Sequence, residues 1–181
     1  MIMSKGHLTK ISILTLGVMF LAFGNIFAQE GAKDVNQKGM ESFQKGDYDG
    51  AIAEFTKAIE QTPNDAEAYN KRGLVHNAKG DYDQTISDYT KAIELNSNFV
   101  GAYFNRGLTY AHKGHNDQAI ADYSKAIELY SKFPDAFYNR ALAYYAMQDY
   151  AKASEDVNKA QELGYKVPQE FLDELKKASG K

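Results

Sequence analysis

The chain has 181 residues, of which 44% are hydrophobic and 25% charged, and its formal net charge at pH 7 is -3. This is the composition of an ordered globular protein, and the slight excess of acidic residues gives no electrostatic basis for binding nucleic acid. The absence of cysteine excludes disulfides, thiolate zinc ligands and a cysteine nucleophile.

The N-terminal 28 residues have the pattern of a secretory signal peptide. Lys5 and Lys10 form a basic stretch without acidic residues, residues 11–27 are mainly apolar, and Ala28 is a small residue at the expected cleavage point. We therefore expect residues 1–28 to be removed and the mature chain to be exported, to the periplasm or another extracytoplasmic space. The alternative is an uncleaved anchor facing the periplasm, because the apolar run is about as long as a membrane span.

The rest of the chain follows a 34-residue repeat. Small residues recur at this spacing at Gly39, Gly73, Gly107 and Ala141, and alanine recurs at Ala58, Ala92, Ala126 and Ala160. Aromatic residues recur in the same way, at Tyr69, Tyr103 and Phe137 and at Phe55, Tyr89 and Tyr123. A period of this length, with two amphipathic segments in each unit, is typical of a helix–turn–helix solenoid.

These positions resemble the tetratricopeptide-repeat family. The third repeat carries the family pattern at Tyr103, Gly107, Tyr110, Ala119, Tyr123 and Ala126. The first repeat ends on Pro63, as the family pattern does, whereas Ser97 and Ser131 replace this proline in the next two.

The resemblance implies an all-α, right-handed solenoid of four helix–turn–helix units plus a C-terminal capping helix. We expect a repeat domain over residues 29–167, with repeats one to four at residues 32–65, 66–99, 100–133 and 134–167. Residues 168–181 are predicted to form the capping helix and tail, because Phe171, Leu172 and Leu175 share one helical face.

Acidic residues after the turn inside the repeats are predicted to cap the second helices. Asp47, Asp81 and Asp149 occupy this position, and Asp81 with Gln84 has the spacing of a capping box.

One charge pattern departs from the family, in which the residue before the small position is usually apolar. Here that residue is basic and the residue before the second-helix aromatic position is acidic, which gives four predicted ion pairs: Lys38 with Glu54, Arg72 with Asp88, Arg106 with Asp122, and Arg140 with Asp156. Because each basic residue has an acidic complement of matching length, we favour a structural role. The alternative is that the arginines face an anionic ligand.

In this family the first helices of successive repeats line a concave groove that receives a peptide or a partner helix. Carried over by offset, the resemblance places these residues in the groove: Asn70, Lys71, Phe104, Asn105, His112, Tyr138, Asn139 and Tyr145. Amides can bond to an extended backbone and aromatic residues can fill pockets, so we expect a protein or peptide partner. Some family members clamp a C-terminal carboxylate, but Gly101 and Asp135 stand where that pattern requires lysine.

No residue pattern in the sequence is specific enough to predict a catalytic or metal-binding site. His112 and His115 lie three residues apart without an evident third ligand, so a surface turn explains them better than a metal site. No phosphate loop, Ser–His–Asp order or paired-carboxylate site is present, so we expect no enzyme activity, cofactor, metal or small-molecule substrate.

Two functions remain open at this stage. The first is a non-catalytic scaffold or adaptor that binds a peptide or partner protein in its groove. The alternative is a structural subunit of a cell-envelope assembly, possibly anchored by an uncleaved signal segment.

Overall fold

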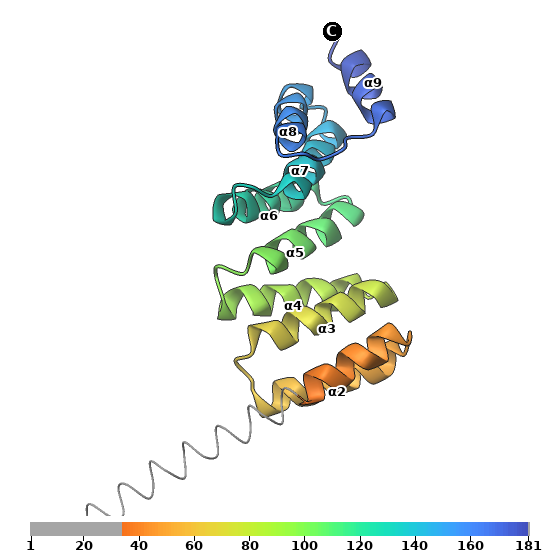
Figure 1. The fold of residues 1–181 in the computed structure, drawn as a ribbon, viewed down its shortest axis with the longest axis vertical. Helices are drawn as coiled ribbons and strands as arrows, with labels where there is room; N and C mark the ends of the chain where they lie inside the picture. The colour runs from red at the N-terminus through yellow and green to blue at the C-terminus, as the bar shows by residue number, and fades with distance from the viewer. Residues whose placement is uncertain (1–33, 181) are drawn as a thin grey trace, which may run out of the picture. The chain divides into compact units, whose positions relative to one another are not determined.

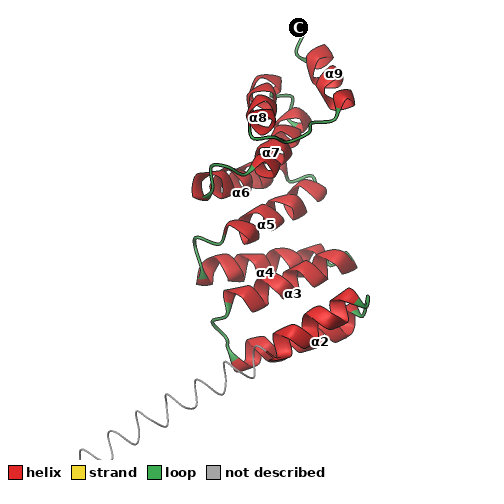
Figure 2. Ribbon diagram, in the orientation of Figure 1, coloured by secondary structure: helices red, strands yellow, loops and turns green. Residues whose placement is uncertain are grey.

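The computed structural model describes residues 34–180, so the predicted signal peptide lies outside the described residues. Throughout this described range the chain forms helices joined by short turns, without a strand (Figure 2). It divides into two compact parts, one ending at Asn64 and the other beginning at Asp65.

The N-terminal part is a pair of helices, one over residues 34–44 and the other α2 (Tyr48–Gln61). Asp47 caps α2, since its carboxylate accepts a hydrogen bond from the Gly50 amide at 2.9 Å. Phe55 is fully buried against Gly39, where an added Cβ would lie 2.9 Å from the phenyl ring. The small residue therefore allows the two helices to approach closely.

The C-terminal part is a series of helices that pack against their neighbours in chain order (Figure 1). In order they are α3 (Ala66–Lys79), α4 (Tyr82–Leu95), α5 (Val100–His112), α6 (Asn116–Leu129), α7 (Pro134–Ala146), α8 (Tyr150–Glu162) and α9 (Gln169–Ala178). The helix pairs α3–α4, α5–α6 and α7–α8 form repeats two, three and four.

The turn inside each repeat requires a left-handed backbone conformation. Gly80 and Gly114 supply it with φ angles of 85° and 75°, at no steric cost because glycine lacks a Cβ atom. In repeat four the same position is Gln148, with φ 62°. Repeat four therefore makes the same turn at the expense of some backbone strain.

The predicted caps form at two of the three aspartates. Asp149 accepts a hydrogen bond from the Lys152 amide at 3.2 Å, as Asp47 does from Gly50. The predicted capping box at Asp81 is wrong, because its side chain makes no capping hydrogen bond to α4. Its carboxylate instead lies 3.6 Å from Nδ1 of His76.

Tyr123 is the buried aromatic residue of α6, and its hydroxyl group has no hydrogen-bond partner. Burial raises the pKa of this phenol, so the group stays neutral. A buried hydroxyl without a partner has lost its hydration without compensation. Phe55 occupies the equivalent position of repeat one without this cost.

We therefore expect Tyr123→Phe to increase the free energy of unfolding by up to about 1 kcal/mol. The ring and its packing against Gly107 remain, and only the unpaired oxygen is removed. Urea denaturation followed by circular dichroism would show a higher midpoint. A midpoint lower than that of the wild type would mean that the hydroxyl group has a stabilising partner.

Candidate interaction surface

Each repeat of the C-terminal part contains an ion pair between an arginine of its first helix and an aspartate of its second. In repeat three, Arg106 donates from Nε to Asp122 Oδ2 at 2.8 Å and from Nη2 to Oδ1 at 2.7 Å. The same two-bond pairing joins Arg72 to Asp88 and Arg140 to Asp156. The aspartates are nearly buried, so the paired hydrogen bonds offset a large desolvation cost.

Arg106 and Arg140 also bond to the preceding repeat. Arg106 donates from Nη1 to Thr90 Oγ1 of α4 at 2.9 Å, and Arg140 donates from Nη1 to Ser124 Oγ of α6 at 2.8 Å. Hydrogen bonding to Asp122 raises the pKa of Arg106 above its usual range. The guanidinium groups of Arg106 and Arg140 each connect three helices: the arginine's own helix, the second helix of its repeat and the second helix of the preceding repeat. This arrangement favours a structural role over recognition of an anionic ligand.

The predicted ion pair between Lys38 and Glu54 does not form. Lys38 pairs instead with Asp34 of its own helix at 2.6 Å, and Glu54 pairs with Lys57 at 2.6 Å. The Lys38 side chain is 57% exposed, whereas that of Arg72 is 20% exposed. A flexible, hydrated ammonium group gains little from a cross-helix partner when a carboxylate lies one helical turn away.

Five of the predicted groove residues lie on α3 and α5: Asn70, Lys71, Phe104, Asn105 and His112. Lys71 pairs with Glu67 at 3.0 Å, while the Asn70 side chain has a buried Oδ1 atom without a hydrogen-bond partner. Within the described part of the chain, the Asn105 side chain also has no hydrogen-bond partner. Leu108, one turn further along α5, is 37% exposed and is one of the few large apolar side chains at the surface.

His112 lies at the C-terminal end of this α5 face and contacts the first residue of α4. Its ring centroid is 4.6 Å from that of Tyr82, and its Nε2 atom is 3.4 Å from the tyrosine hydroxyl. The neighbouring Lys113 forms an ion pair with Asp83. His115 instead caps the start of α6 with its backbone, so the two histidines have separate roles.

The remaining predicted groove residues also have contacts within the protein: Phe104 on α5 and Tyr138, Asn139 and Tyr145 on α7. Phe104 packs against Tyr123 and Phe133, with ring centroids 5.8 Å and 4.7 Å away. Asn139 donates to the backbone carbonyl of Asp135 at 2.8 Å. The Phe104 ring and the Asn139 amide nitrogen therefore already have partners within the protein.

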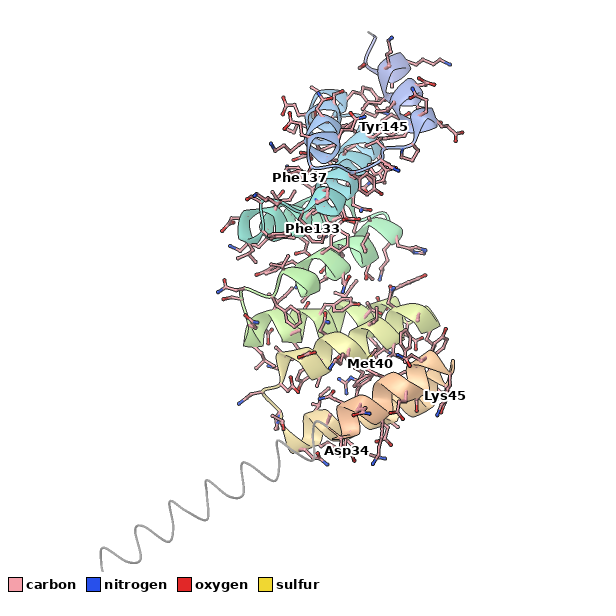
Figure 3. All side chains as sticks on the ribbon, viewed as in Figure 1. Asp34, Met40, Lys45, Phe133, Phe137 and Tyr145 are labelled. Atoms are coloured by element: carbon pink, nitrogen blue, oxygen red, sulfur yellow. The ribbon has the colours of Figure 1, made fainter. Side chains whose placement is uncertain are left out.

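Tyr138 and Tyr145 of α7 lie beneath the C-terminal segment. The ring of Tyr138 stacks on that of Tyr165, with centroids 4.5 Å apart. Tyr138 and Tyr145 each meet the ring of Phe171 from α9 edge-on. Figure 3 shows Tyr145 directed from α7 toward α9. The aromatic end of the predicted groove is therefore covered by the chain's own residues.

Family models match most of the chain beyond its N-terminal segment. A "TPR repeat" model matches residues 39–80 and 110–148, and three "Tetratricopeptide repeat" models match residues 66–99, 88–121 and 134–163. The chain belongs to the tetratricopeptide-repeat family. The all-α solenoid of helix pairs with a C-terminal helix, predicted from the sequence, is thereby confirmed.

Several solved structures share this fold. MamA is 24% identical, with a TM-score of 0.71 over 90% of this chain and 96% of its own. A repeat protein from Parabacteroides merdae is 22% identical, with a TM-score of 0.75 over 83% of this chain and 61% of its own. The first repeat domain of Spaghetti (RPAP3), bound to an HSP90 peptide, is 24% identical, with a TM-score of 0.64 over 65% of this chain and 94% of its own.

The second helices of this tetratricopeptide-repeat protein carry paired charges on their exposed faces. Lysine and glutamate three residues apart form ion pairs at Lys91–Glu94, Lys125–Glu128 and Lys159–Glu162. Such pairs keep a helix face hydrated and contribute little to stability. On the first helix α5, by contrast, the Asn105 side chain has no hydrogen-bond partner within the part of the chain that the structure describes.

A membrane span is not found in this repeat region. No helix between residues 34 and 180 has both the length and the apolar character needed to cross a bilayer.

Proposed function

We propose that this protein is a non-catalytic interaction scaffold that binds a peptide or a partner protein on the first helices of repeats two and three. The observation that carries the proposal is the exposed Leu108 beside Asn105, an amide without a hydrogen-bond partner in the described chain. An apolar contact next to a free donor and acceptor is suited to an extended peptide backbone with an apolar side chain.

The charges of this surface indicate which ligands fit. Lys71 is neutralised by Glu67, and the arginines bind aspartates of their own repeats. The surface therefore does not require an acidic ligand. The peptide complex of the Spaghetti domain supports peptide binding as a use of this fold, but Gly101 and Asp135 stand where a carboxylate clamp requires lysine. We therefore propose that an internal segment of the partner binds here.

The test is a cross-linking capture of the tagged protein in its native envelope, followed by mass spectrometry. We expect Asn105→Ala with Leu108→Ser to reduce recovery of the partner by about tenfold or more, because a few central contacts carry most of the binding energy. The matched control is Lys125→Ala with Glu128→Ala on α6, which should capture the partner as the wild type does.

Equal recovery with the α5 double variant and the wild type would contradict the proposal. If deletion of residues 29–61 then abolished recovery, the alternative function as a structural subunit of an envelope assembly would be favoured.

We also propose that the scaffold works outside the cytoplasm after export. The support is the basic, apolar and small-residue order of residues 1–28. Mass spectrometry of the N-terminus of the captured protein should find Gln29 as the first residue. An N-terminus that retains residues 1–28 would favour the membrane-anchored alternative.

A further inference from the structure

An aromatic strip connects the exposed Leu108 of α5 to the turn between repeats three and four. Phe104, one helical turn before Leu108, has its ring centroid 4.7 Å from that of Phe133, and the centroid of Phe133 is 6.0 Å from that of Tyr130. Leu108 and Tyr130, at the two ends of the strip, are 37% and 52% exposed. The strip therefore extends the surface proposed above beyond the first helix on which it begins.

The fold does not require an aromatic residue at position 130. Asn96 is the equivalent residue in the turn between repeats two and three, with φ and ψ of -141° and 93°, against -141° and 90° for Tyr130. In both turns the amide of this residue donates to an alanine carbonyl four residues earlier, at 2.9 Å. Asn70 likewise stands where repeat three has Phe104. The aromatic strip is thus a feature of this junction rather than a requirement of the repeat.

The polar groups of the strip are uncharged. Neither the Asn105 side chain of α5 nor the Tyr130 hydroxyl has a hydrogen-bond partner among residues 34–180. Both groups can donate a hydrogen bond to a carbonyl oxygen. The nearest charges in the sequence balance, because Lys132 precedes Phe133 and Asp135 follows it. The strip therefore offers aromatic rings and hydrogen-bond donors to an uncharged segment.

A proline-rich segment fits this combination better than a helix or a β-strand does. The rings of the strip are tilted by 47° and 46° to their neighbours, so they present an uneven aromatic surface against which proline rings can pack. A polyproline II segment has no internal hydrogen bonds, and its carbonyl groups remain free to accept. The carbonyl groups of a helix are already bonded within it, and a β-strand needs a backbone edge that these side chains do not provide.

We propose that the aromatic strip selects the partner, and that it binds an uncharged, proline-rich segment in the polyproline II conformation. Proline rings pack against Phe104, Phe133 and Tyr130, and the Asn105 amide donates to a backbone carbonyl of the segment. Because this conformation is already formed in the free segment, binding costs little conformational entropy. The inference rests on the proposed function, since Leu108 and Asn105 belong to both surfaces.

The test is an NMR titration of the full chain with a synthetic peptide of repeated Ala-Pro-Pro, compared with a peptide in which glycine replaces every proline. We expect only the proline peptide to shift the signals of Asn105 and Tyr130. We expect Tyr130→Asn to weaken its binding about tenfold. Circular dichroism should not change, because Asn96 makes the same turn in repeat two.

The matched control is Met147→Asn, which removes an exposed apolar side chain outside the strip. Met147 lies at the opposite end of α7 from Phe133, about 20 Å away along the helix. This variant should bind the proline peptide as the wild type does. Equal binding of the proline and glycine peptides would overturn the inference, and so would equal affinity of Tyr130→Asn and the wild type.

A photo-cross-linking phenylalanine analogue in place of Tyr130 separates this inference from the proposed function. In the capture experiment it should cross-link to a proline-rich segment of the partner. A cross-link to a segment without proline would overturn the inference. Loss of the partner with Asn105→Ala and Leu108→Ser, but not with Tyr130→Asn, would also overturn it, and the proposed scaffold function would remain supported.

Discussion

Replacing Arg106 with methionine is expected to lower the free energy of unfolding by about 3 to 5 kcal/mol. The substitution leaves Asp122 nearly buried without a charge partner, and Thr90 loses the donor that joins repeat two to repeat three. Methionine preserves much of the side-chain volume, so the loss comes from the uncompensated carboxylate rather than from a cavity. Urea denaturation followed by circular dichroism measures the effect.

Two comparison variants separate this mechanism from a general effect of charge. Lys125→Met breaks the exposed pair with Glu128 and should change stability by less than about 1 kcal/mol. Arg106→Met combined with Asp122→Leu removes both charges and should recover most of the lost stability. A small effect of Arg106→Met, combined with loss of the captured partner from a folded protein, would indicate that the arginine binds a ligand instead.

The repeat pattern was sufficient to predict three of these ion pairs but not to exclude the fourth. Sequence places complementary charges at equivalent offsets in all four repeats, and arginine pairs with aspartate wherever the carboxylate is nearly buried. Lys38 carries the same sign as Arg106, yet it pairs locally with Asp34. The offset fixes which residues can meet, whereas exposure and the geometry of the basic group decide whether they do.

The candidate site was less predictable than the fold, because aromatic residues have the same sequence signature in a binding surface and in a core. Tyr138 and Tyr145 occupy positions that line the groove in this family, but Tyr165 and Phe171 from later in the chain pack on them. The 34-residue step from Phe137 to Phe171 was the available signal for this contact. Asn105 lacks such a contact and remains a candidate for binding.

Gly107→Ala is the second substitution with a large expected effect, and its result follows from a comparison of the repeats. A Cβ atom at Gly107 would lie 2.7 Å from Cε1 of Tyr123, which is fully buried. Alanine favours a helix over glycine by about 1 kcal/mol, but overpacking a buried ring costs about 1 to 3 kcal/mol. We therefore expect a net loss of stability, seen as a lower urea midpoint.

Repeat four shows how a residue larger than glycine is accommodated at this position. There the small position is Ala141 and the facing aromatic position is Val157, so the larger residue on α7 is matched by a smaller one on α8. Tyr123→Val alone should cost about 3 to 5 kcal/mol by leaving a cavity. Combined with Gly107→Ala it should cost less than the sum of the single changes, because the added methyl group occupies part of that space. Additive losses would mean that the two positions are not coupled through this contact, and the small residue would then be explained by the backbone rather than by the ring.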